Sequence, residues 1–326
     1  MKRKLLKTIL ILVAFTQAIF SQVTETESKL KKQVPDTLQG WEKGAVTNLN
    51  LAQTSLTNWA AGGENSLAVN GLISAFVNYR KDKIVWNTTL DIGYGLLQQG
   101  TGGAFRKTDD KFDFLSKVGR KAAKNLYYTV LLNFKTQMSP GYDYPNDSTK
   151  TKISDFLAPA YLLGALGMDY QPNSHVSIFA APITEKITIV NDQALADSGA
   201  FGVKPAIFDS ERTLLKNGEK AKYEFGGYIR MSYTKNDFKS EILKNVAFTT
   251  KIDLFSNYLH NPQNIDVNWE TLLAFKVNKF LVVNFNMQLI YDDDIKIHYD
   301  KNNPAKTGPR TQFKEILGVG FAYNFK

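Results

Sequence analysis

The sequence predicts an all-β protein that folds as a closed, antiparallel, up-and-down transmembrane β-barrel of about 12 strands. Three observations lead to this prediction. Apolar and polar residues alternate over segments of roughly ten residues, the length of a membrane-crossing strand. The connections between these segments alternate between short and long. After residue 22, no uncharged apolar run is long enough for a membrane-spanning helix.

The N-terminus has the features of a secretory signal. A basic start precedes an apolar run from Ile9 to Phe20, which is shorter than the roughly 20 residues that a spanning helix needs. We therefore predict a signal peptide over residues 1–21, cleaved before Gln22, rather than a membrane anchor. A short periplasmic segment over residues 22–43 and an outer-membrane barrel over residues 44–326 are expected to follow.

Composition excludes several classes of protein. The chain has 326 residues, of which 43% are hydrophobic and 12% aromatic, so it is too rich in large apolar side chains for disorder. It contains no cysteine, which excludes disulfides and thiolate metal sites. The formal charge of +9 falls to +5 without the four basic residues of the signal, and these charges are scattered. We expect no nucleic-acid partner.

In the first third of the chain, the segment Lys83–Leu97 alternates most clearly. One face carries Ile84, Trp86, Leu90, Ile92, Tyr94 and Leu96. The other face is small or polar and includes Asp91, as expected of a strand with lipid on one side and a polar interior on the other. Residues 66–80 form a similar strand, and residues 44–53 and 111–120 form weaker ones.

In the middle of the chain, residues 126–137 form a strong strand. Residues 155–170 and 175–190 are weaker because they contain Pro159 and Pro182. Proline cannot donate a ladder hydrogen bond, so we expect a kink or a bulge at each of these positions.

Five strong strands complete the predicted sheet, at residues 223–233, 246–254, 265–277, 281–292 and 313–325. The same alternation also suits a soluble β-sandwich or a lipocalin-like barrel, in which the apolar face points inward. About 12 long strands with alternating connection lengths favour the membrane barrel.

The connections form two groups. Short turns are predicted at residues 81–82, 122–125, 172–174, 235–238 and 278–279, and longer links at residues 54–64, 98–108, 138–154, 191–222, 258–264 and 294–310. Outer-membrane barrels have short periplasmic turns and longer outer loops. Both ends of the barrel then lie on the short-turn side, where the first and last strands can pair.

The alternation assigns side chains to the two surfaces of the barrel. Lipid-facing or interfacial positions are Trp86, Tyr94, Trp269, Phe285 and Tyr323. Charged residues predicted to face the lumen are Arg80, Asp91, Lys117, Lys135, Asp169, Glu185, Glu224, Arg230, Lys251, Asp253, Glu270 and Lys276. Because both signs occur, we expect pairing across the lumen rather than a ring of one charge. A barrel of this size then has a narrow or plugged lumen.

The longest connection, residues 191–222, is the best candidate for a plug or an outer cap, since so long a link is usually functional. The expected partners are outer-membrane lipid and proteins that bind the outer loops or the lipid-facing wall. No cofactor is expected.

Two weak candidate sites remain. Ser256 and His260 lie near the predicted outer rim, where a lipid hydrolase would place a nucleophile and its base, but no acid partner is evident. Acidic residues that offer hard oxygen ligands for Ca²⁺ follow the penultimate strand: Asp292, Asp293, Asp294 and Asp300. Ordinary rim residues and a solvated acidic loop are the simpler interpretations.

Several stretches resemble an uncharacterised family of exported Bacteroidota proteins. They are NLAQTSLTNWAAGGENSLAVN (50–70), RKTDDKFDF (106–114), LLNFKTQMSPGYDYPND (131–147), ISDFLAPAYLLGALGMDY (153–170) and ADSGAFGV (196–203). The resemblance covers nearly all of the mature chain. It implies an outer-membrane β-barrel of undefined activity, and no catalytic residue carries over from it.

The sequence therefore favours a non-enzymatic outer-membrane barrel, acting as a structural or partner-binding protein or as a narrow conduit. A lipid-modifying hydrolase and a small-solute uptake channel are the alternatives. A continuous lumen lined by lysine and arginine favours uptake, whereas a network of opposite charges across the lumen opposes it.

Overall fold

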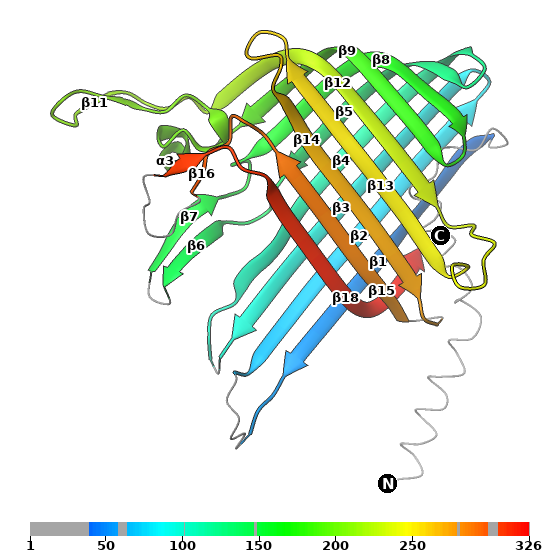
Figure 1. The fold of residues 1–326 in the computed structure, drawn as a ribbon, viewed down its shortest axis with the longest axis horizontal. Helices are drawn as coiled ribbons and strands as arrows, with labels where there is room; N and C mark the ends of the chain where they lie inside the picture. Colours follow the sequence, from blue (N-terminus) through cyan, green and yellow to red (C-terminus); the bar gives the residue numbers. More distant parts are fainter. Residues whose placement is uncertain are drawn as a thin grey trace.

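The computed structural model describes residues 39–57, 64–100, 102–146, 149–278, 281–298 and 306–325. Twelve strands close into one antiparallel barrel, and each pairs with its neighbours in the chain order of the barrel strands (Figure 1). They are Gly40–Thr54 (β1), Ser66–Lys81 (β2), Ile84–Gln99 (β3), Arg106–Ala123 (β4), Leu126–Thr136 (β5), Ala160–Asn173 (β8), Val176–Ile189 (β9), Ala221–Lys235 (β12), Val246–Asn257 (β13), Ile265–Lys276 (β14), Leu281–Tyr291 (β15) and Gln312–Phe325 (β18). The predicted fold class is confirmed.

One end of the barrel carries mainly tight turns. β2 and β3 are joined through Asp82, and β4 and β5 through Asn125, and both residues adopt the positive φ that Asp and Asn tolerate in turns. The turn predicted at residues 235–238 is wrong in extent, because β12 and β13 are joined by residues 236–245. Polar residues without alternation fill this connection, so periodicity did not mark its end.

The other end carries the longer connections and their own small elements. These are the hairpins Gly141–Asn146 with Thr149–Ser154 (β6 and β7), Ile207–Phe208 with Leu214–Lys216 (β10 and β11) and Ile297–His298 with Thr307–Gly308 (β16 and β17), the helix Gln193–Asp197 (α3) and the 3₁₀ turn Ala200–Gly202 (η1). β10 and β11 project away from the barrel (Figure 1). No helix among the described residues is long and apolar enough to cross a membrane.

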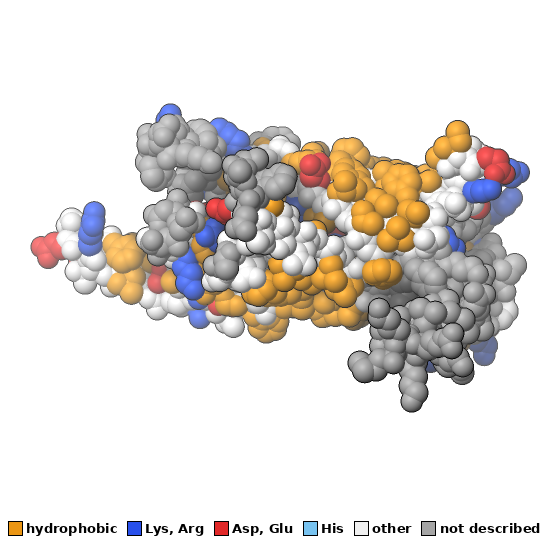
Figure 2. Space-filling model, turned by 90° about the horizontal axis from the view of Figure 1, so that it is seen from below, with side chains coloured by type: hydrophobic (Ala, Val, Ile, Leu, Met, Phe, Trp, Pro, Cys, Tyr) orange, Lys and Arg blue, Asp and Glu red, His pale blue; other side chains and the backbone are white. Residues whose placement is uncertain are grey.

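The barrel is apolar outside and polar inside. Trp86 and Trp269 are 39% and 37% exposed, and Phe285 is half-buried. In the view of Figure 2, hydrophobic side chains cover the middle of the wall and charged ones gather toward its two ends. Buried polar side chains include Asn78, Asp113, Asp169, Thr188 and Glu224. This is the reverse of a soluble protein and matches a wall that faces lipid.

Aromatic side chains cluster at the tight-turn end. The ring centroids of Trp41 and Tyr79 lie 4.7 Å apart, and those of Trp41 and Trp86 lie 5.6 Å apart. This arrangement is typical of the interfacial girdle of a membrane barrel. Tyr94, halfway along the wall, hydrogen-bonds instead to Ser139, with 3.0 Å between the hydroxyl oxygens. The side chain of Tyr323 lies outside the described side chains.

A bulge at Pro182 reverses the two faces of β9. The pairing with β12 shifts between Thr184 and Ala181, so that Phe179 points inward before the bulge and Lys186 points inward after it. The prediction that Glu185 faces the lumen is wrong, because the extra residues of the bulge turn its side chain to the exposed outer surface. Pro159 was expected to form a kink or a bulge within a strand, but it lies outside the strand, immediately before β8.

The first barrel strand begins at Gly40, four residues before the predicted barrel start at residue 44. The expected signal peptide over residues 1–21 lies outside the described residues. So does Asp300.

Candidate functional site

A network of opposite charges crosses the lumen halfway along the barrel. We call it the ionic belt, and it consists of Lys111, Asp113, Lys135, Arg230, Lys251, Asp253 and Glu270. Five of these were expected to face the lumen from the sequence. Lys111 and Asp113 were missed, because charged residues occupy both faces of the segment RKTDDKFD and hide its alternation.

The central contact of the ionic belt joins opposite walls. The Nζ atom of Lys111 on β4 lies 2.9 Å from a carboxylate oxygen of Glu270 on β14. Five strands separate β4 from β14 in either direction around the barrel. Lys251 approaches the same carboxylate at 3.1 Å, and it lies 3.7 Å from Asp113. The belt therefore spans the lumen rather than lining one wall.

A second part of the ionic belt surrounds Asp253. Its carboxylate accepts a hydrogen bond from the Tyr228 hydroxyl at 2.6 Å and forms an ion pair with Arg230, whose Nε lies 3.1 Å away. Lys135 of β5 lies 3.8 Å from the same group, and three strands separate β5 from β13 along the shorter way around the barrel. Four basic and three acidic side chains thus form one polar network with a net charge of +1, and their mutual contacts hold them in fixed positions.

Among the described residues, two cavities of the lumen adjoin the ionic belt. A cavity of about 240 Å³ lies toward the tight-turn end, and its lining includes Asn, Ser and Thr side chains together with charged ones. A cavity of about 400 Å³ lies toward the loop end. Both linings include Lys111, Asp113 and Glu270, so the two cavities meet at the belt.

Other predicted lumen residues make contacts outside the belt, and Asp91 lies beside it, in register with Asp113. Lys117 pairs with Asp169 at 2.6 Å near the tight-turn end. Asp91 accepts a hydrogen bond from the Ser74 hydroxyl, and Arg80 is buried with a 3.4 Å contact from Nη1 to the hydroxyl of Tyr127. Lys276 is half-buried at the end of β14.

A second charged group, which we call the mouth cluster, lies at the loop end of the lumen. It comprises Lys186, Lys222, Glu224, Asp266, Asp292, Asp293 and Asp294. Lys186 contacts Asp266 at 2.6 Å, Glu224 at 3.4 Å and Asp292 at 3.5 Å. Sequence reasoning missed Lys186 because of the bulge in β9. The mouth cluster therefore has a net charge of −3, whereas the belt has a net charge of +1.

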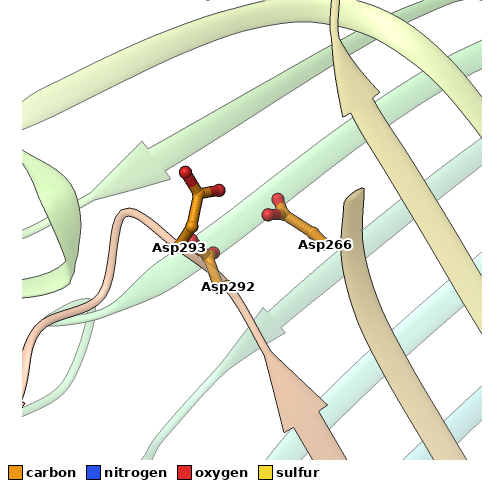
Figure 3. A group of neighbouring side chains, drawn as sticks. All are labelled: Asp266, Asp292 and Asp293. Carbon is orange, nitrogen blue, oxygen red and sulfur yellow. The ribbon is translucent and has the colours of Figure 1, made fainter. Parts of the chain in front are cut away.

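Three carboxylates of the mouth cluster come close enough to hold a metal ion. Ligand atoms of Asp266, Asp292 and Asp293 lie within 4.8 Å of one another (Figure 3). The ammonium group of Lys186 already contacts two of the three. Asp294, expected as a further ligand, pairs instead with Lys222. The arrangement thus has an internal cation in place of a metal.

Ser256 and His260, the candidate hydrolase residues, form hydrogen bonds with other groups and not with each other. The Ser256 hydroxyl donates to the carbonyl oxygen of Pro262 at 2.7 Å. His260 lies in the exposed turn after β13, with Nε2 3.4 Å from the side-chain amide of Asn261. The serine proton is thereby directed to a backbone carbonyl and not to an imidazole, so this geometry does not activate a nucleophile.

The long connection after β9 caps the loop end. A small buried core joins Ala158, Val190, Leu195, Ala196 and Val203. Phe201 of η1 lines the larger cavity. Asp192 caps α3, because its side chain accepts a hydrogen bond from the Leu195 amide at 3.0 Å. The pKa of Asp192 lies below its usual value, mainly because of the hydrogen bond from Lys152 and secondly because of the hydrogen bond from the Leu195 amide. The cap is therefore tied both to the barrel and to the β6–β7 hairpin.

Comparison with known proteins gives a family match but no activity. The model of a family described as Protein of unknown function (DUF3078) matches residues 51–142. The expected resemblance to an uncharacterised family is confirmed over this segment. The match is shorter than the resemblance expected from the sequence. A search of curated proteins found no match.

Solved structures of several outer-membrane proteins are similar in fold. An outer membrane channel from Pseudomonas putida F1 is 8% identical, with 90% of this chain and 97% of the other covered and a TM-score of 0.37. The translocator domain of the autotransporter NalP from Neisseria meningitidis is 8% identical, with 94% and 93% covered and a TM-score of 0.37. The P. putida toluene transporter TodX is 10% identical, with 94% and 93% covered and a TM-score of 0.28. At such identities the likeness concerns the fold alone.

Proposed function

We propose that this protein is a non-enzymatic barrel of a Gram-negative outer membrane, exported by its N-terminal signal, and that it forms a narrow conduit for small polar solutes. Its apolar outer wall contacts membrane lipid. The observation that carries the proposal is the ionic belt, which crosses the lumen exactly where the two cavities meet. It acts as the barrier of the conduit.

The mixed charge of the belt, with a net charge of only +1, argues against strong ion selectivity. A selective channel carries a ring of one sign, whereas here lysine and arginine are paired with aspartate and glutamate across the lumen. An anion-uptake channel would need a continuous path lined by lysine and arginine, and the acidic residues of the belt interrupt such a path. Small neutral or zwitterionic molecules, which do not compete with these ion pairs, are the solutes that such a lumen suits best.

Swelling of proteoliposomes in a graded series of solutes tests this proposal. We expect slow entry of urea and glycine and no entry of disaccharides, compared with liposomes that lack the protein. Rapid entry of disaccharides would identify an open pore. Exclusion of every solute in the series would identify a closed scaffold, and either result would overturn the narrow conduit.

A further inference from the structure

The barrel wall is incompletely joined between its first and last strands. β1 and β18 pair over only six residues of each strand, from Ala45 with Phe325 to Asn50 with Gly320. Beyond this point β1 still pairs with β2 as far as Thr54, and β18 still pairs with β15 from Gln312. Both strands are therefore intact, and only the contact between them ends. Figure 1 shows the outer ends of β1 and β18 diverging toward the loop end.

Asn50 marks the place where the two strands part. Its side chain lies directly against Gly318 and Gly320 of β18, where an added Cβ atom would come within 2.6 Å and 2.1 Å of the Asn50 amide. These glycines let the strands approach closely at the last paired position. The continued ladder would set Leu51 against Val319 and Gln53 against Leu317, but these pairs are not formed.

The two sides of the opening differ in polarity. On the outer surface, Leu51 is 59% exposed and Leu317 is 70% exposed. On the inner surface, Lys314 lines both cavities, and its ammonium lies 2.9 Å from Asp109 of β4. Ile316 also lines the smaller cavity. The opening thus leads from an apolar rim that faces the bilayer to a charged lumen.

Unpaired strand edges are costly in lipid, because no water is present to hydrogen-bond the free backbone groups. A barrel that keeps two such edges side by side must gain from contact with something that enters between them. An apolar rim followed by a charged inner edge fits a molecule with an acyl chain and a polar headgroup.

We propose that β1 and β18 form a lateral port in the outer half of the wall, through which a membrane amphiphile inserts its headgroup into the lumen while its acyl chain remains in the bilayer. The port is independent of the axial conduit, since it lies in the wall and does not involve the ionic belt. Failure of one proposal therefore leaves the other standing.

Disulfide trapping tests whether the port exists. Because the chain has no native cysteine, only the introduced cysteines can form a disulfide. The variant Gln53→Cys/Leu317→Cys probes the port. The matched control Leu49→Cys/Phe321→Cys lies four residues away on each strand, at a paired position of the same ladder. In lipid nanodiscs under mild oxidation, we expect the control to cross-link fast and the port pair at least tenfold more slowly. Equal rates would show a closed wall and overturn the proposal.

Quenching by brominated phospholipid tests whether acyl chains reach the lumen. A bimane label on Ile316→Cys reports on the inner side of the port. The control is Leu272→Cys, a residue that lines the same cavity from β14, which is paired on both edges. We expect lipid bromine to quench the Ile316 label at least threefold more than the Leu272 label. Equal quenching of the two labels would overturn the entry of an amphiphile.

Discussion

Asp253 is the residue on which one half of the ionic belt depends. It accepts a hydrogen bond from Tyr228, forms an ion pair with Arg230 and lies 3.8 Å from Lys135 of β5. Asp253→Ala leaves the buried Arg230 guanidinium without its carboxylate partner. We expect a loss of about 3–5 kcal/mol in the free energy of unfolding, because an uncompensated buried charge is costly. Urea titration in lipid vesicles, followed by tryptophan fluorescence, measures this value.

The control for Asp253 is Glu241→Ala. Glu241 forms an exposed ion pair with Lys244 in the connection between β12 and β13, and such pairs contribute little to stability. We expect its free energy of unfolding to change by no more than about 0.5 kcal/mol. An Asp253→Ala variant as stable as this control would show that the belt does not stabilise the barrel.

Asp192 makes the cap sensitive to acid. Its folded pKa lies below the usual value of 3.8, chiefly because of Lys152 and then because of the Leu195 amide. A group with a lowered folded pKa stabilises the native state above its unfolded pKa and loses this effect as pH falls through the folded value. We therefore expect the hydrogen-exchange protection factor of the Leu195 amide to be constant near neutral pH and to fall below about pH 4.

Asp192→Asn provides the matched comparison for the cap. Asparagine still accepts the capping hydrogen bond but carries no charge. Its protection factor should remain nearly independent of pH over the same range. A pH dependence as steep as that of the unmodified protein would assign the effect to another group.

At the scale of the strands, the alternation of the sequence was sufficient to predict the architecture. All twelve barrel strands lie where a predicted strand lies, since a strand between lipid and a polar lumen must alternate. Side-chain orientations were predicted wrongly where a local feature interrupted the alternation of apolar and polar residues. The bulge at Pro182 exchanged the orientations of Glu185 and Lys186, and charges on both faces of RKTDDKFD concealed Lys111 and Asp113.

The candidate site was less predictable than the fold. Several lumen charges could be predicted from the sequence, because orientation follows from parity along a strand. Their partners could not, because the pair Lys111 and Glu270 joins strands that lie far apart in the chain and opposite in the barrel. Which charges meet across the lumen depends on the shear of the barrel, and this does not follow from the pattern of any one strand.

Closure of the barrel depends on a close approach at Gly320. An added Cβ atom there would lie 2.4 Å from the Leu49 carbonyl oxygen, in the short ladder that joins β1 to β18. We expect Gly320→Ala to lower the free energy of unfolding by about 1–3 kcal/mol through overpacking. Urea titration in lipid vesicles measures the change.

Gly164→Ala is the glycine control in β8, because an added Cβ atom there meets nothing within 4 Å. We expect a change of no more than about 0.5 kcal/mol. If both alanine variants were equally stable, the contact between β1 and β18 would not limit closure of the barrel.

At the scale of the whole molecule, charge is arranged along the barrel axis. The tight-turn cavity is lined by polar, apolar and charged side chains, the belt carries charges of both signs, and the mouth cluster beyond it is acidic. Any solute that crosses must pass the belt, since both cavities end there. The belt thus serves both as the barrier of the lumen and as a set of contacts that hold opposite walls together.

Single-channel conductance in planar bilayers tests this role most directly. Lys111→Ser/Glu270→Ser removes both partners of the central pair, so no buried charge is left alone, and Lys244→Ser/Glu241→Ser removes an exposed pair outside the lumen. We predict small conductance for the unmodified protein and for the exposed-pair variant, and at least threefold larger conductance for the Lys111/Glu270 variant. Equal conductance in all three proteins would contradict the account.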